Sequence, residues 1–112
     1  MIGNTTEGFS PSSLVIVNLV NPKEKFFGML LSLSAAGVTV RGINLDSFDD
    51  WIRQLARGDE PDLDLITMFM PLFRVERIFL DEASGSLQSF AQRFEEVVGM
   101  PIEKHLQLDG GH

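Results

Sequence analysis

The sequence predicts a mainly β fold with added helices: a small, bent, five-stranded antiparallel barrel with a helical insertion between strands 3 and 4 and a C-terminal amphipathic helix. Residues 14–42 contain three short apolar runs separated by turns of only a few residues. Strands joined so closely must be antiparallel, because a parallel crossover needs about a dozen residues. Further apolar runs occur at residues 63–70 and 72–80, whereas residues 47–57 and 86–98 repeat apolar side chains at helical spacing.

Length and composition indicate one globular domain. The chain has 112 residues, of which 44% are hydrophobic, so it can form a modest core. The net charge of −7 disfavours nucleic-acid partners, and the absence of cysteine excludes disulfides and thiolate chemistry. We expect residues 14–100 to form the domain, with a flexible arm at 1–13 and a tail at 101–112.

The N-terminal arm carries no targeting pattern. Residues 1–13 are rich in Gly, Ser, Thr and Asn and lack the basic start and apolar core of a signal peptide. The longest apolar run, residues 26–33, is too short to span a bilayer. A cytoplasmic protein is the resulting expectation.

The first three strands come from residues 14–20, 26–33 and 38–41. In the first strand Asn18 marks the more polar face. The second strand is apolar on both faces, which places it centrally, and Gly28 is the position where we expect it to bend.

The helical insertion begins at Ser47, which can cap a helix, and ends at Gly58. Trp51 suits either a ligand-stacking platform or the anchor of this helix, and its spacing favours the anchor. The fourth strand, residues 63–70, stops or bends at Pro71, which cannot donate to a ladder. A turn and the fifth strand follow within residues 72–80.

The C-terminal helix is expected at residues 86–98, capped by Ser84 or Ser86 and ended by Gly99 and Pro101. Beyond this helix, we expect residues 102–112 to form a short turn and then to be disordered. The helix carries one apolar stripe made of Leu87, Phe90, Ala91, Phe94, Val97 and Val98.

Three segments resemble the Sm-like family, which includes the bacterial Hfq proteins. Residues 17–21 (VNLVN) followed by 27–30 (FGML) resemble its first motif, residues 69–78 its second, and residues 38–40 (VTV) its third strand. The resemblance implies an SH3-like barrel that forms rings by pairing the fourth strand of one subunit with the fifth strand of the next. It also implies RNA binding.

The chain departs from the Sm-like pattern at the positions that bind RNA. Residues 33–37 lack the Asp and Asn that hold bases, and Phe73 and Arg74 stand where Hfq proteins have Lys and His. An Hfq-like RNA-binding role is therefore the alternative function. Its candidate phosphate contacts are Arg41, Arg74 and Arg77.

No residue pattern predicts a catalytic, cofactor or metal site. Asp46, Asp49 and Asp50 suit either a metal cluster or a helix start, and the helical pattern that follows favours the helix start. The acids at residues 60–64 lack the glycine and distant Glu of a calcium loop. His105 has no zinc-ligand spacing.

The sequence therefore predicts a non-enzymatic interaction or assembly module that self-associates and presents a surface to a protein partner. The fourth strand is apolar on both faces, which is unusual for an edge strand facing water. We expect a homo-oligomer, no membrane and no DNA. The predicted interface residues are Met68, Phe69, Met70, Ile78, Phe79 and Leu80.

Overall fold

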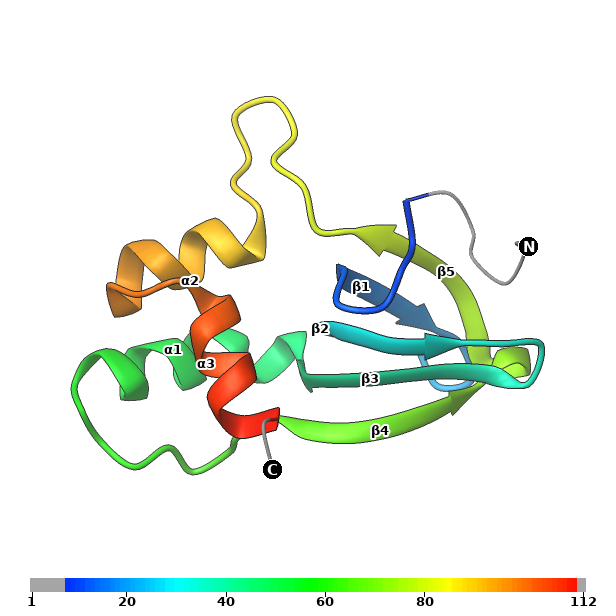
Figure 1. Ribbon diagram of the computed structural model, residues 1–112, viewed down its shortest axis with the longest axis horizontal. Coiled ribbons are helices and arrows are strands. Elements are labelled where there is room, and N and C mark those ends of the chain that lie inside the picture. Colours follow the sequence, from blue (N-terminus) through cyan, green and yellow to red (C-terminus); the bar gives the residue numbers. More distant parts are fainter. Residues whose placement is uncertain (1–7, 111–112) are drawn as a thin grey trace.

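The structure, a computed structural model, describes residues 8–110, with side chains as far as Leu106. Five strands form one antiparallel sheet in the order β4-β3-β2-β1-β5 (Figure 1). The strands are β1 (Leu14–Leu19), β2 (Glu24–Leu33), β3 (Gly37–Asn44), β4 (Ile66–Pro71) and β5 (Val75–Leu80). The helices are η1 (Leu45–Ser47), α1 (Phe48–Ala56), η2 (Leu72–Arg74), α2 (Phe90–Val98) and α3 (Ile102–Gly110).

The predicted mainly β class, with five antiparallel strands and a helix between the third and fourth, is confirmed. The sheet is strongly curled. In a flat sheet the two edge strands would lie about 19 Å apart, whereas the chain from Pro71 to Val75 can span about 14 Å at most. The sheet of the expected barrel is not closed in the described residues, because β4 and β5 occupy opposite edges without pairing.

Both faces of the sheet are apolar, and each packs a separate core. The inner face, on the inside of the curl, carries Val15, Val17, Leu19, Leu30, Val38, Val40 and Met70. The outer face is covered at one end by the three α-helices (Figure 1). There Phe27 and Ile43 pack with Phe48, Trp51, Ile52, Leu65, Phe94, Ile102 and Leu106.

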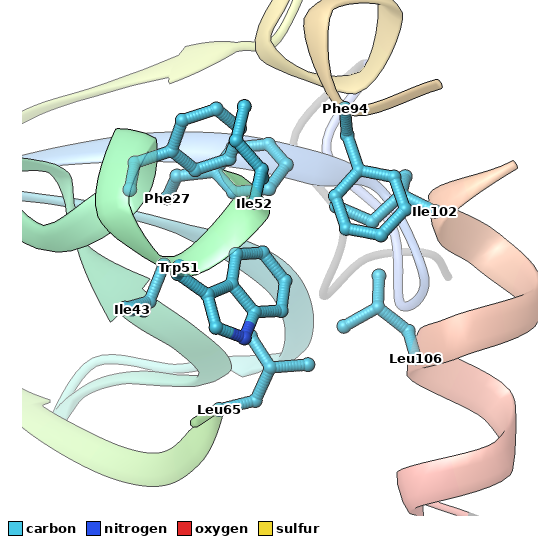
Figure 2. Packing of buried hydrophobic residues seen from close by; sticks show 9 residues of the cluster. Phe27, Ile43, Trp51, Ile52, Leu65, Phe94, Ile102 and Leu106 are labelled. Carbon is cyan, nitrogen blue, oxygen red and sulfur yellow. The ribbon is translucent and has the colours of Figure 1, made fainter. Parts of the chain in front are cut away.

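Trp51 is an anchor and not an exposed platform. It is buried, and its ring contacts Phe48, Phe94 and His105 at centroid distances of 6.0, 5.3 and 5.5 Å. Figure 2 shows its indole in the middle of the outer cluster. The helical spacing of the insertion therefore identified its anchor correctly.

Gly28 lies opposite Gly42 on β3, and the irregularity of β2 lies elsewhere. The register shifts between Leu30 and Ser32, so the expected bend at Gly28 is displaced by a few residues. A Cβ on Gly28 would lie 2.7 Å from the Cα of Gly42 and closer still to the Arg41 carbonyl oxygen. The glycine permits this close approach of two backbones.

The second α-helix begins later than expected. Residues 84–87 form a tight hairpin, because Ser84 and Leu87 exchange backbone hydrogen bonds of 3.0 and 2.9 Å. Ser89 is the N-cap instead of Ser84 or Ser86, and it forms a capping box with Gln92. Leu87 consequently lies outside the helix and is 72% exposed.

Both terminal predictions need correction within the described residues. Residues 8–13 of the expected arm are held to the sheet, since Ser12 N donates to Leu30 O and Leu30 N donates to Ser13 O, each at 2.8 Å. The expected tail forms α3, because Ile102 and Leu106, one turn apart, are buried in the outer cluster. Residues 1–7 and 111–112 of the expected arm and tail lie outside the described residues.

None of the helices within residues 8–110 is long and apolar enough to cross a membrane.

The first prediction concerns the inner core. We expect Leu30→Ala to lower the free energy of unfolding by about 2–4 kcal/mol, because it removes buried methyl groups from a packed cluster. Urea unfolding followed by circular dichroism measures it. Leu87→Ala, at an exposed leucine, is the control and should change little; equal effects would contradict the assigned burial.

The second prediction concerns α3. Removing residues 101–112 withdraws two buried side chains and exposes Trp51 and Phe94, at a cost of about 3–6 kcal/mol. The truncated chain should melt at a lower temperature and bind the dye anilinonaphthalene sulfonate. A chain lacking only residues 111–112 is the control, and unchanged melting of the longer truncation would refute the docking of α3.

Candidate functional site

Among the described residues no strand pairs with the outer edge of β4, so backbone groups there are unpaired. Leu72 N donates to Ala36 O at 3.0 Å, which fixes the alternation of hydrogen bonds between β3 and β4. Met68 and Met70 then direct their backbone groups to β3, whereas those of Thr67 and Phe69 point away from the sheet. The backbone donors of Met68 and Met70 are therefore not free at this edge.

The side chains of β4 divide between the core and the surface. Met70 is buried in the inner cluster and Met68 is partly buried against it, so neither offers a free apolar surface. Phe69 is 55% exposed and Ile66 57% exposed. Ile66 was not predicted as an interface residue. The expected strand began at residue 63, three residues before the paired segment, which starts at Ile66.

The free edge of β5 also combines outward-pointing backbone groups with an exposed apolar side chain. Asp81 N donates to Leu14 O at 2.9 Å, so Phe79 pairs with β1 while the backbone groups of Ile78 and Leu80 point outward. The Phe79 side chain is 45% exposed, whereas those of Ile78 and Leu80 are partly buried. Of the predicted interface residues on this strand, Phe79 offers its side chain for contact, and Ile78 and Leu80 offer their backbone groups for pairing.

An apolar hollow of about 290 Å³ lies beside the β5 edge. Protective charges occur only at the start of β5, at Glu76 and Arg77, and Pro71 protects only the end of β4. The central residues of both edge strands therefore lack the charges or proline that prevent pairing with another strand. The hollow is lined by Phe9, Leu33, Leu72, Val75, Glu76, Arg77 and Ile78.

The three arginines proposed for RNA do not form one basic strip. Arg74 donates to Val20 O at 2.9 Å, to Pro22 O at 2.8 Å and to Glu24 at 3.0 Å, and so fastens the β1–β2 turn. Arg41, on β3, donates to Thr67 at 3.2 Å. Arg77, on β5, is three strand positions away, about 14 Å in a flat sheet.

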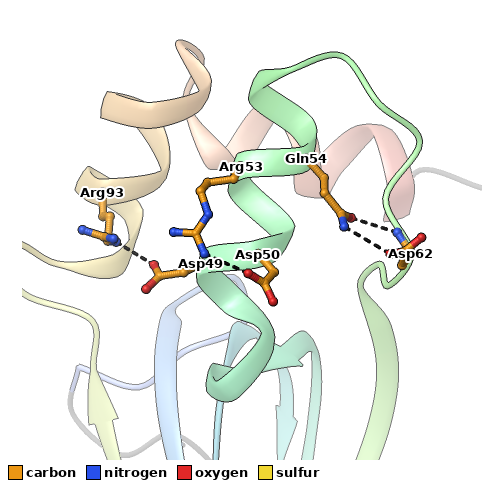
Figure 3. Close-up of polar contacts among 6 residues, drawn as sticks. All are labelled: Asp49, Asp50, Arg53, Gln54, Asp62 and Arg93. Carbon is orange, nitrogen blue, oxygen red and sulfur yellow. Dashed lines mark hydrogen bonds and ion pairs between the residues drawn. The ribbon is translucent and has the colours of Figure 1, made fainter.

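The acids at the start of α1 have structural partners. Asp49 accepts from Arg93 of α2 at 2.8 Å, and Asp50 accepts from Arg53 at 2.8 Å (Figure 3). Gln54 holds the loop after α1 by bonding both the backbone and the side chain of Asp62, at 2.9 and 3.2 Å. In residues 8–110, no group of three or more His, Cys, Asp or Glu side chains is placed to hold a metal ion.

A groove along the outer face of β1 is the feature that sequence analysis missed. Two hollows of about 560 and 460 Å³ share Asn18, Lys25 and Leu45 in their linings. In the sequence, Asn18 indicated only that one face of β1 is more polar. The other residues that line the groove include Leu45 and Phe79, which lie far from Asn18 in the chain. The groove is therefore a product of the tertiary fold.

No protein-family model, curated protein or solved structure matches this chain. The Sm-like resemblance therefore stays a prediction.

Proposed function

We propose that the chain is a non-enzymatic assembly module on an Sm-like barrel, which self-associates through its sheet edges and presents a further surface to a protein partner. One observation carries the proposal: both edge strands have unpaired backbone groups beside exposed apolar side chains. Exposed edges of this kind pair with other strands unless charges or proline protect them.

The two edges are complementary. The outward backbone groups of Thr67 and Phe69 on one copy can pair with those of Ile78 and Leu80 on the next. In an antiparallel pair Phe69 would stand directly opposite Ile78 or Leu80, and such cross-strand pairs of apolar side chains contribute about 0.2–1 kcal/mol.

The symmetry of such pairing determines the assembly. An interface between β4 and β5 is heterologous, so it must close into a ring or propagate as a filament. A ring would also remove every free edge, as closed barrels do.

The third prediction tests the edges. Ile66→Lys with Phe69→Lys should convert the native oligomer to a monomer, because two charges would be desolvated at the edge. Sedimentation velocity at tens of micromolar measures the mass. Met70 is avoided because it is buried in the core.

Leu63→Lys is the matched control, since Leu63 is an exposed leucine in the loop before β4. It should leave the mass unchanged. A native protein that sediments as a monomer would refute self-association, and so would an Ile66/Phe69 variant with native mass.

The fourth prediction addresses the RNA-binding alternative. Arg74 is engaged in holding the β1–β2 turn, and the net charge is −7, so we expect single-stranded oligouridylate to bind more weakly than micromolar at about 150 mM salt. Fluorescence anisotropy of labelled RNA measures it. Tight binding that weakens with added salt and is reduced by Arg41→Gln and Arg77→Gln would instead support the Hfq-like role.

A further inference from the structure

Within the described residues, the outer face of β1 is hollowed between β5 and the start of β2. The groove follows Ile16, Asn18 and Leu19, with β5 on one side and Lys25 and Leu45 on the other. The hairpin at residues 84–87, which projects from the body of the molecule in Figure 1, borders one end. The two contiguous hollows have the volumes of ligand sites in proteins.

The middle of the groove is apolar. Ile16, Leu45 and Phe90 line it from three different elements. Phe79 and Leu87 add apolar side chains that are 45% and 72% exposed. An occupant that covers these two side chains would remove apolar surface from water.

Asn18 places an amide in this apolar setting. It is the only polar residue of β1, and its Oδ1 is buried without a partner among the described groups. An amide offers both a donor and an acceptor, which matches the two polar groups of a peptide bond. Rotation about the broad χ2 torsion can turn either atom toward the groove.

Three of the seven charged side chains that line the groove have partners elsewhere in the fold. Glu24 accepts from Arg74 at 3.0 Å, and Glu76 lies 3.6 Å from Arg77. Asp81 caps α2, accepting from Phe90 N at 2.8 Å and from Ala91 N at 2.9 Å. Arginine therefore compensates the charges of Glu24 and Glu76, and the positive N-terminus of α2 partly compensates that of Asp81.

The remaining charges give the groove a polarity. Lys23 and Asp46 line only the hollow near the β1–β2 turn, and Lys25 lines both hollows, so the charges without such partners leave one excess positive charge on this side of the groove. Glu82 stands at the hairpin end. An occupant should thus carry a negative group at the lysine end and a positive group near Glu82.

We propose that this groove binds the carboxyl-terminal segment of a partner protein. The free carboxylate lies by Lys23 and Lys25, the last peptide group bonds Asn18, and apolar side chains cover Phe79 and Leu87. A basic residue upstream approaches Glu82. The proposal rests on the proposed function for the existence of a protein partner, but it uses a surface separate from the backbone edges.

The fifth prediction uses two forms of one dye-labelled peptide, Lys-Thr-Leu-Ser-Val, ending in a free carboxylate or in an amide. The full chain should bind the free acid about tenfold more tightly, since charge-assisted bonds to lysine are lost in the amide. Fluorescence anisotropy gives both affinities. Backbone amide shifts of Asn18, Leu45 and Leu87 in ¹⁵N spectra should locate the site.

Variants separate the parts of the groove. Lys23→Gln with Lys25→Gln should remove the preference for the free acid, whereas Lys104→Gln, at the third lysine of the chain, should keep it. Leu87→Ser should weaken both peptides without unfolding the protein, because Leu87 is largely exposed. None of these changes should alter the sedimenting mass, so a failure here is distinct from a failure of edge assembly.

Several results would overturn the proposal. These are equal affinity for acid and amide, equal effects of the Lys104 and Lys23/Lys25 variants, or shifts centred on β4. Absence of binding at millimolar peptide would do the same. Binding of decanoate in the groove, with no binding of either peptide, would assign the site to an acyl ligand instead.

Discussion

A sheet that is apolar on both faces must be covered on both faces, and this constraint organises the whole molecule. The curl covers the inner face by bringing Val17, Leu30 and Met70 into one cluster. The outer face cannot cover itself, so a second layer of chain has to lie on it. Phe27 and Ile43 project from the sheet, and Trp51 and the helices around it bury them away from water. This burial of apolar surface stabilises the fold.

The polar contacts follow from this packing. Arg93 and Asp49 join α2 to α1 at the rim of the outer cluster, and Asp81 fixes the start of α2 to the end of β5. The Arg93–Asp49 ion pair is exposed and contributes little energy, so it orients the two helices while the apolar cluster stabilises them. The helices gather at one end of the sheet (Figure 1). The two sheet edges and the β1 groove remain accessible in the described residues.

Local patterns predicted the strands, and tertiary contacts decided what the patterns missed. Runs of β-branched residues and tight turns placed β1 to β3, and Trp51 with its helical neighbours placed α1. Ile102 and Leu106 alone make too short a stripe to predict α3, which depends on the cluster beneath it. Phe79 was predicted as an interface residue, but the groove beside it joins segments that no local pattern relates.

Successive residues of β5 direct their backbone groups alternately toward β1 and away from the sheet. The proposed assembly site and the proposed groove site therefore use different groups of this strand. The backbone groups of Ile78 and Leu80 point out of the sheet edge, whereas Phe79 bonds to β1 and turns its side chain to the outer face. A neighbouring strand would therefore use the edge, and a ligand in the groove would use the Phe79 ring. Each occupant shields the ring from a different side, so assembly and partner binding can coexist on one strand.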